Sequence, residues 1–292
     1  MSVGNIFKFI TNHPLNKDNK VAAITRFIKW QARLRSTDKP IVYQFTERAK
    51  IFVKKGMSGV TGNLYCGLHE YEDMAFLLHF LRKGELFADI GANVGSYTIL
   101  AGAHVGARTI SIEPIPGTFK LLSDNVSLNK LSDTATLLNI GLGAKKSLLK
   151  FTKSLDTVNH VATENELDTI DVPIDVMDSV LQDTPPALMK IDVEGFETEV
   201  LKGGHNTLKN PALKAIIIEL NGSGDRYGYD ESAIHKLLLE NDFRPYKYHP
   251  FKRTLEPLET FGAFNTIYIR DVNFVTERIK SAESIRVLGH II

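Results

Sequence analysis

The chain has 292 residues, of which 43% are hydrophobic and 24% charged, an ordinary composition for a globular protein with a sizeable core. Lys and Arg number 35 against 34 Asp and Glu, so the charge does not support a nucleic-acid-binding protein, and we expect no nucleic-acid partner. The single cysteine, Cys66, excludes an intrachain disulfide and a multi-cysteine metal site, and we expect a buried thiol rather than a nucleophile.

The amino-terminal sequence shows neither a targeting nor a membrane pattern. It lacks the long apolar core and small-residue cleavage site of a signal peptide, and no run of about 18 apolar residues occurs anywhere in the chain. We therefore expect a cytoplasmic protein with no membrane span.

Residues 1–66 are expected to form an extension of helices and short strands. "NKVAAITRFIKWQARLR" places Ile24, Phe27, Ile28 and Leu34 at helical spacing among basic residues. We interpret it as a cover helix with a solvated basic face; the alternative is a helix that lies on a membrane or a phosphorylated partner. "IVYQF" and "KIFVKK" then predict short strands, and the glycine-punctuated "GMSGVTGN" follows them.

"HEYEDMAFLLHFLRKG" predicts a helix, and from Glu85 onward strand and helix patterns alternate. The strands are "ELFADI", "RTISIEP", "ATLLNIGLG", "ALMKIDVE" and "KAIIIEL"; the helices are "SYTILAGAHV", "PGTFKLLSDNVSLNK", "DVMDSVLQD", "ETEVLKGGHNTLK" and "DESAIHKLLLENDF". This order predicts an α/β fold with a doubly wound, mostly parallel sheet. "RPYKYHP" and "FNTIYIRD" lack a crossover helix between them, which predicts a terminal antiparallel hairpin. Residues 272–292 would be a tail packed on the core.

Ligands of such sheets bind at the carboxyl ends of the strands, near the point where the strand order reverses. Five residues are expected at these strand ends: Asp89, Glu113, Gly141, Asp192 and Glu219.

The turn after the first of these strands, "ADIGANVGSYTILA", carries the first chemical signal. A dinucleotide-binding turn has the pattern G-x-G-x-x-G, because its pyrophosphate approaches backbone N–H groups at a helix start. Here Gly91, Asn93 and Gly95 follow the acid Asp89, which would repel a pyrophosphate. A ligand with an ammonium and a sulfonium cation would suit that acid, and S-adenosylmethionine is such a ligand.

The second signal is Glu113, which ends the next strand 22 residues after Gly91. A carboxylate at this place accepts ribose hydroxyls in both nicotinamide and adenosylmethionine enzymes, so it does not discriminate between them alone. Together with the acid-first turn it favours S-adenosylmethionine.

The third signal is "LMKIDVEGFETEVLKGG". Lys190, Asp192 and Glu194 alternate along an extended segment and are expected on the same side of it. Charges at the end of a central strand are costly to bury unless they are paired or used. Both a Lys190–Asp192 anchoring pair and a catalytic role fit the pattern.

These blocks, with "ISIEPIPGTFKLLSDNVSLN" and the late "NTIYIRD", resemble the FkbM-type methyltransferases. The resemblance runs from about Gly67 to about Asp271 and is carried above all by I-D-V-E-G-x-E. It implies a class I Rossmann-like methyltransferase domain over residues 67–271, with S-adenosylmethionine as cofactor and O-methylation of sugar or natural-product hydroxyls as activity.

The resemblance also implies roles for single residues. The cofactor would be held by Asp89, Gly91, Asn93, Gly95, Ser96, Glu113 and Pro114, with Gly141 near the adenine. Asn125 belongs to the N-x-x-x-N helix block and would only orient the sheet edge.

Removing a hydroxyl proton during methyl transfer requires a base within hydrogen-bond reach. Asp192 is our first choice and Glu194 the second, while Glu219, His249 and His160 are candidates for binding the acceptor. We expect no metal ion; a divalent ion held by Asp192, Glu194 and Glu219 is the alternative, since carboxylates suit Mg²⁺ or Ca²⁺.

The residues leave two other functions as alternatives. One is an NAD(P)-dependent oxidoreductase on a related fold; Asp89 is evidence against it. The other is a non-catalytic cofactor-binding adaptor; the charged I-D-V-E-G-F-E block is evidence against it.

The segment "NGSGDRYGYD" is rich enough in glycine to move as a lid.

Overall fold

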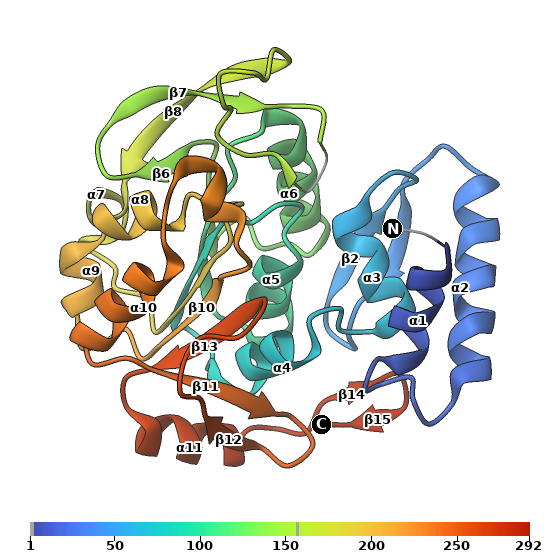
Figure 1. Ribbon diagram of the computed structural model, residues 1–292. Coiled ribbons are helices and arrows are strands. Elements are labelled where there is room, and N and C mark those ends of the chain that lie inside the picture. Colours follow the sequence, from blue (N-terminus) through green and yellow to red (C-terminus); the bar gives the residue numbers. More distant parts are fainter. Residues whose placement is uncertain (1–2, 156–157) are drawn as a thin grey trace.

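The computed structural model describes residues 3–155 and 158–292, apart from the side chains of residues 3, 58 and 59 (Figure 1). Its centre is an eight-stranded sheet in the order β12-β11-β13-β10-β9-β3-β4-β5. The strands are β3 (Leu86–Ile90), β4 (Arg108–Ile112), β5 (Ala135–Leu138), β9 (Leu188–Ile191), β10 (Ala215–Glu219), β11 (Arg244–His249), β12 (Thr254–Pro257) and β13 (Asn265–Ile269).

The five strands from β10 to β5 are parallel, and β13, β11 and β12 continue the sheet in antiparallel pairs. The predicted doubly wound, mostly parallel sheet with an antiparallel end is therefore confirmed. Strand β12 was not predicted, because the loop that contains it is short and polar. The chain order reverses between β3 and β9, which places the ligand-binding edge at the carboxyl ends of these two strands.

Helices cover both faces of this sheet (Figure 1). One layer contains α4 (Tyr71–Phe80), α5 (Ser96–Ile99), the π-helix η1 (Leu100–Val105), α6 (Pro116–Leu128) and α11 (Val272–Lys280). The other contains α7 (Met177–Leu181), α8 (Glu197–Lys202), α9 (His205–Lys209) and α10 (Glu231–Glu240). Strand side chains alternate between the layers: Leu188 packs in the first core and Met189 and Ile191 in the second.

The predicted helix over 197–209 is divided into α8 and α9 at Gly203 and Gly204. A Cβ atom on Gly203 would lie 2.3 Å from the carbonyl oxygen of Gly143, so the backbone comes too close for any side chain. Gly143 belongs to a second, three-stranded sheet of β6 (Gly141–Gly143), β8 (Thr169–Val176) and β7 (Ser147–Thr152). The single strand predicted over 135–143 is thus two strands in different sheets, and the β7–β8 hairpin was not predicted.

An amino-terminal lobe lies beside the sheet domain, shown in blue on the right of Figure 1. It contains α1 (Val3–Asn12), α2 (Lys20–Arg35), β1 (Ile41–Gln44), β2 (Lys50–Val53) and α3 (Ser58–Cys66). In helix α2 Leu34 is buried and the basic residues Lys29, Arg33 and Arg35 are exposed, whereas Ile28, which the spacing grouped with the apolar positions, is 56% exposed. The glycine-punctuated segment is helix α3. Cys66 is buried as predicted, and burial raises the pKa of its thiol to about 12.

The carboxyl-terminal residues close the molecule below the two parts. The hairpin of β14 (Arg286–Val287) and β15 (His290–Ile291) follows α11, and Val275, Ile279 and Val287 are buried. None of the described helices is long and apolar enough to cross a membrane.

Asn125 of α6 and Asn129, the residue that caps this helix, attach the lobe to the sheet domain. The Asn125 side chain accepts the N–H of Phe52 in β2 at 2.7 Å and donates to the carbonyl of Val94 at 2.8 Å. One turn later, Asn129 pairs with both backbone groups of Lys50 at 2.8 and 2.6 Å. The N-x-x-x-N block therefore holds β2 against the glycine turn.

We expect Asn125→Ala to lower the free energy of unfolding by about 2–4 kcal/mol, because it leaves the buried N–H of Phe52 and carbonyl of Val94 unpaired. Urea unfolding of this variant beside Ser127→Ala, an exposed neighbour on the same helix, measures the effect. Equal free energies for the two variants would contradict the attachment.

Candidate active site

The turn between β3 and α5 is compressed between two neighbouring strands. Gly91 has a φ of +82° and Gly95 of +91°, and Asn93 has a φ of 52°. A Cβ atom on Gly91 would lie 1.7 Å from the carbonyl oxygen of Asp192 at the end of β9. The N–H groups of Gly91 and Ala92 donate to Ile112 at the end of β4. Only glycine fits at position 91, because both its backbone conformation and the neighbouring carbonyl exclude a side chain.

Asp89 lies inside β3 and is almost fully buried. Its carboxylate accepts the hydroxyl of Thr98 at 2.6 Å, and Thr98 in turn contacts Ser111 on β4 at 2.7 Å. Burial raises the pKa of Asp89 to about 6, and the nearby Lys190 ammonium opposes that rise. Asp89 therefore holds α5 through Thr98 and places a negative charge below the glycine turn.

Glu113 fixes the end of β4 to the glycine turn. One carboxylate oxygen accepts the N–H of Asn93 and the other the N–H of Ile115, both at 2.9 Å. Burial raises the pKa of Glu113 to about 7, against the effect of these two donors. The Asn139 amide donates to the carbonyls of Glu113 and Pro114 and so braces the same corner.

A small cavity opens beside this corner. Its lining includes most of the predicted cofactor residues together with β9-end residues: Gly91, Asn93, Glu113, Pro114, Thr118, Gly141, Leu142, Phe151, Asp192, Glu194 and Phe196. Ser96 lines a second cavity instead, and Gly95 lies against Leu122. The predicted residues of the turn, of β4 and of β6 thus meet around one space.

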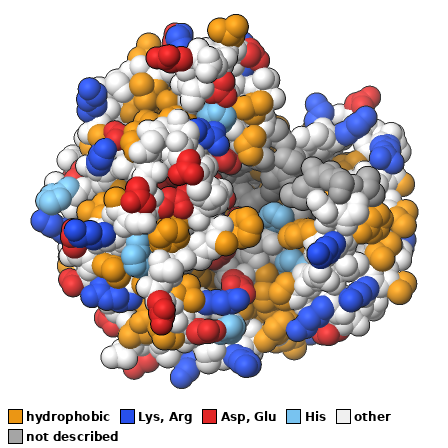
Figure 2. All heavy atoms as spheres, viewed as in Figure 1, with side chains coloured by type: hydrophobic (Ala, Val, Ile, Leu, Met, Phe, Trp, Pro, Cys, Tyr) orange, Lys and Arg blue, Asp and Glu red, His pale blue; other side chains and the backbone are white. Residues whose placement is uncertain are grey.

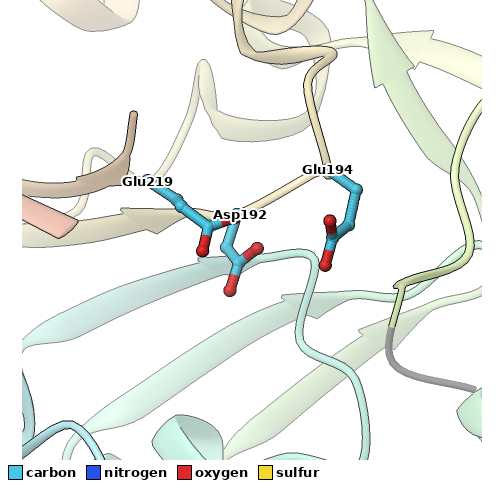
Figure 3. Close-up of side chains that lie close together, drawn as sticks. All are labelled: Asp192, Glu194 and Glu219. Atoms are coloured by element: carbon cyan, nitrogen blue, oxygen red, sulfur yellow. The ribbon is translucent and has the colours of Figure 1, made fainter. Parts of the chain in front are cut away.

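Three carboxylates gather at the ends of β9 and β10, namely Asp192, Glu194 and Glu219 (Figure 3). Each offers an oxygen atom, and these three atoms lie within 4.8 Å of one another. The buried Lys190 ammonium donates to Asp192 at 2.5 Å and lies 4.8 Å from the centre of the Tyr97 ring. The Lys190–Asp192 pair expected from the sequence is therefore present.

The backbone at Glu194 is not the extended segment that the sequence predicted. Strand β9 ends at Ile191, and Glu194 has a left-handed φ of 55° within a turn. Gly195 is required next to it, because a Cβ atom there would lie 2.5 Å from the Ser223 carbonyl oxygen. The side chains of Asp192 and Glu194 nevertheless lie close together (Figure 3).

Crowding of like charge controls protonation in the cluster. Burial and then Asp192 raise the pKa of Glu194 to about 7. Burial, Asp192 and Glu194 raise the pKa of Glu219 to about 9, so this carboxyl group carries a proton at neutral pH. One of the Glu219 oxygens is buried without a hydrogen-bond partner among the described residues. Burial alone would lower the pKa of Lys190, but Asp192, Glu70 and Asp89 raise it, so Lys190 stays charged.

Glu197, the third acid of I-D-V-E-G-F-E, has a structural position. It is buried and accepts the N–H groups of Val193 and Gly195 at 3.0 and 3.3 Å. These bonds hold the turn that presents Glu194.

A larger cavity of about 600 Å³ lies on the other side of the glycine turn. The residues that line both cavities are Gly91, Asn93, Asp192 and Glu194. The larger cavity adds Asp89, Ser96, Lys190, and three residues that sequence reasoning missed, His69, Glu70 and Tyr97. His69 and Glu70 precede α4, and only their helix-start pattern was visible in the sequence. Asp192 and Glu194 thus stand at the junction of the two cavities, whereas Glu219, a predicted acceptor-binding residue, lines neither of them.

The structure brings neither predicted histidine to these cavities. His160 is buried, and its two ring nitrogens contact the Val158 carbonyl and Glu166 at 2.7 and 3.0 Å, which fixes the loop after β7. His249 ends β11 and pairs with Glu256 across the β11–β12 turn at 2.6 Å. Both have partners that explain them structurally. The predicted lid contains the 3₁₀-helix η3 (Ser223–Tyr227), whose Tyr227 hydroxyl donates to Val161 at 2.6 Å.

Comparisons with known proteins agree with the resemblance found in the sequence. Hexuronic acid methyltransferase AglP of Haloferax volcanii is 28% identical over 174 residues, 59% of this chain and 68% of the relative. Methyltransferase 1 of Beauveria bassiana is 29% identical over 142 residues, covering 39% of this chain and 56% of that relative. This chain thus spans little more than half the length of the second relative.

Among solved structures, Precorrin-6y C5,15-methyltransferase of Geobacter metallireducens has a TM-score of 0.39 at 16% identity, covering 69% of this chain and 87% of that one. An rRNA methylase of Streptococcus thermophilus has a TM-score of 0.40 at 14% identity, covering 68% and 93%. The methyltransferase FkbM domain matches residues 89–245, which is more than half of the chain and includes the glycine turn, Glu113 and the acid cluster. The chain therefore belongs to the family of FkbM-domain methyltransferases.

Proposed function

We propose that this protein transfers the methyl group of S-adenosylmethionine to a hydroxyl of a sugar, a glycan or a related natural product. The observation that carries the proposal is the meeting of two cavities at Gly91, Asn93, Asp192 and Glu194. The smaller space, of about 70 Å³, marks the corner beside Glu113 at which the adenosine would bind, and the larger space would hold the methionine part together with an acceptor. The hexuronic acid methyltransferase among the relatives supports a sugar as acceptor.

The residues present fit the cofactor. Glu113 has lone pairs left for ribose hydroxyls after accepting two N–H groups, and Gly91 lets the cofactor approach the backbone. Asp89, Glu70 and Asp192 surround the larger cavity with negative charge, which suits an ammonium and a sulfonium group. The cofactor supplies a methyl group that is already activated on sulfur.

The chain then has to align the acceptor, exclude water and remove a proton. In our proposal the Asp192 carboxylate accepts the hydroxyl proton as the oxygen–carbon bond forms, while Lys190 keeps Asp192 oriented. Glu194 stands next to Asp192 and lines both cavities, so it can bind a neighbouring hydroxyl of the acceptor, whereas Glu219 lines neither cavity.

We keep the interpretation without a metal ion. The buried Lys190 ammonium already supplies a positive charge to Asp192. Mg²⁺ in the assay buffer and its removal by a chelator should therefore leave the rate unchanged within a factor of about two.

The pH dependence of product binding tests the role of Glu113. Its pKa of about 7 means that the carboxyl group is protonated below pH 7 and ionised above it. Ribose hydroxyls are bound best by the ionised form, so the affinity for S-adenosylhomocysteine should fall as the pH drops, by up to about tenfold per unit below 7. Calorimetric titrations between pH 6 and 8 measure this.

The variant Glu113→Gln separates this group from the other acids of the site. It should bind S-adenosylhomocysteine more weakly at pH 8 and lose most of the pH dependence. If the affinity of this variant for S-adenosylhomocysteine depends on pH as strongly as that of the unchanged protein, Glu113 does not bind the ribose.

Methyl transfer itself is tested with isotopically labelled S-adenosylmethionine and a set of glycosides, with mass spectrometry of the products. Label on a sugar oxygen is the expected result. Label on nitrogen or on a carboxylate of the acceptor would refute O-methylation.

A further inference from the structure

The amino-terminal lobe forms one wall of the larger cavity. Side chains from all three of its helices line that space, namely Ile6, Phe9, Phe27, Gln31, Thr61 and Tyr65. The family match begins only at residue 89, so this wall belongs to a part of the chain outside it. In Figure 2 the outline of the molecule is notched between the lobe and the sheet domain.

Aromatic rings dominate the lobe's wall. The Phe27 and Tyr65 ring centres are 4.9 Å apart, edge to face, and Phe9 approaches the His69 ring at 5.1 Å. Phe9 is 37% exposed although it lies in a hollow, so its ring is available for contact. The negative face of an aromatic ring suits the polarised C–H groups of a pyranose ring.

Polar groups stand among these rings. The Gln31 amide donates to the Tyr65 hydroxyl at 2.6 Å, which leaves its carbonyl oxygen as an acceptor. His69 also lines the cavity, although its Nδ1 atom is buried against Gly62, where a Cβ atom would lie 2.2 Å from it. Burial lowers the pKa of the ring, so it is neutral at pH 7. Neutral amide and imidazole groups can bind hydroxyls both as donors and as acceptors.

A half-buried arginine ties the helices of this wall together. Arg26 donates to the Tyr65 carbonyl through two nitrogens, at 3.0 and 2.6 Å, and to the Asn16 side chain at 2.5 Å. Asn16 donates in turn to the Ile10 and Tyr65 carbonyls. The three helices are therefore tied together before any ligand arrives, which favours binding of a rigid ring.

The opposite wall is acidic. It carries Glu70, Asp89, Asp192 and Glu194, and Lys190 is the only lysine or arginine among the described residues that line the cavity. That ammonium is already paired with Asp192. A carboxylate on the acceptor would therefore enter without a cationic partner and next to like charge, which is unfavourable.

We propose that the amino-terminal lobe recognises the acceptor, and that the acceptor unit bound there is an uncharged sugar ring rather than a hexuronate. Phe9 and Phe27 pack on the ring's apolar face, and Gln31 and His69 bind its hydroxyls opposite Asp192. This inference rests on the proposed function and names its substrate class, in contrast to the relative that is named for hexuronic acid.

The test compares matched acceptors. The methyl glycosides of glucose, galactose and mannose are each assayed beside the corresponding uronic acid glycoside, with S-adenosylmethionine at saturation. We expect kcat/KM for at least one neutral sugar to exceed that of its uronate by about 30-fold or more. Equal or better turnover of the uronates would overturn the proposal.

Substitutions in the lobe's wall test whether its residues bind the acceptor. Phe27→Ala and the less packed Phe9→Ala should each raise KM for the neutral acceptor about tenfold with little change in kcat, whereas Ile28→Ala, an exposed neighbour on α2, should not. Gln31→Arg places a cation in the cavity and should raise kcat/KM for the uronates relative to the neutral sugars by about tenfold. Unchanged KM values in the phenylalanine variants and an unchanged ratio in Gln31→Arg would refute a recognition role for the lobe.

Titration with S-adenosylhomocysteine shows whether a negative result refutes the proposed methyltransferase function or only the proposed acceptor class. Absence of binding would refute the proposed function itself. Binding by every variant, combined with no methylation of any sugar pair, would leave the cofactor assignment intact and overturn the acceptor class.

Discussion

Asp192→Asn is expected to lower kcat by about 10²–10⁴ while the affinity for S-adenosylhomocysteine stays within about threefold of the unchanged protein. Asp192 lines both cavities and is the carboxylate that Lys190 orients. Asparagine keeps the shape of the side chain but cannot accept a proton at neutral pH. Steady-state rates with a methylated acceptor and calorimetry with the product measure the two quantities.

The substitution also leaves the Lys190 ammonium without its closest partner, and an unpaired buried charge can cost about 3–5 kcal/mol of stability. A second variant, Asp192→Asn with Lys190→Met, removes that charge as well. If Asp192 is the base, the double variant stays inactive even though its stability recovers. Recovery of activity in the double variant would show that Asp192 only compensates Lys190.

Glu194→Gln is the matched control for the base assignment, because Glu194 lies in the same cluster and lines the same two cavities. We expect it to lower kcat by about tenfold or less, since its proposed role is to bind a neighbouring hydroxyl. If Glu194→Gln lowers kcat more than Asp192→Asn does, then Glu194 is the base and Asp192 is the residue that binds a neighbouring hydroxyl.

Gly91→Ala is expected to abolish binding of S-adenosylhomocysteine and to lower the free energy of unfolding by several kcal/mol. The new Cβ atom would lie 1.7 Å from the Asp192 carbonyl oxygen, so either the turn or the end of β9 has to move. Left-handed backbone adds about 1–2 kcal/mol for a residue with a side chain. Because the displaced carbonyl belongs to Asp192, the change reaches the proposed base directly.

Gly84→Ala separates the two contributions to this effect. Gly84 has the same φ of +82°, but a Cβ atom there would meet nothing within 4 Å. Its alanine variant should lose only about 1–2 kcal/mol and keep normal product binding. Thermal unfolding and calorimetry of both variants provide the comparison. Similar losses in the two would mean that backbone strain alone, and not the approach of β9, requires glycine at position 91.

The sheet and its ligand-binding edge could be predicted because the signals are local. Strands β3 and β9 are buried and apolar except for one charged residue each, Asp89 and Lys190, just before their last isoleucine, and parallel strands bring their carboxyl ends to one edge. Asp89, Glu113 and Asp192 therefore had to lie near one another, whatever the loops between them do. The N-x-x-x-N block was assigned to orienting the sheet edge, but in the structure Asn125 joins β2 of the lobe to the glycine turn.

What the sequence did not reveal depends on contacts between distant segments. His69 reads as the start of a helix, and its place in the cavity depends on Gly62, where a Cβ atom would lie 2.2 Å from the ring. The division of residues 135–143 between two sheets follows from the partner strand β8, which sequence periodicity did not pair with it. Phe9 and Phe27 have ordinary helical spacing, and only the docking of the lobe places them opposite the acids.

Titration calorimetry with S-adenosylhomocysteine, with NADH and NADPH as controls, tests the central claim most directly. The acid-first glycine turn, Glu113 and the two joined cavities predict binding of S-adenosylhomocysteine in the micromolar range and none of the nicotinamide nucleotides. Binding of NADH or NADPH in place of S-adenosylhomocysteine would contradict the account, because Asp89 and the acid cluster would then have to accommodate a pyrophosphate.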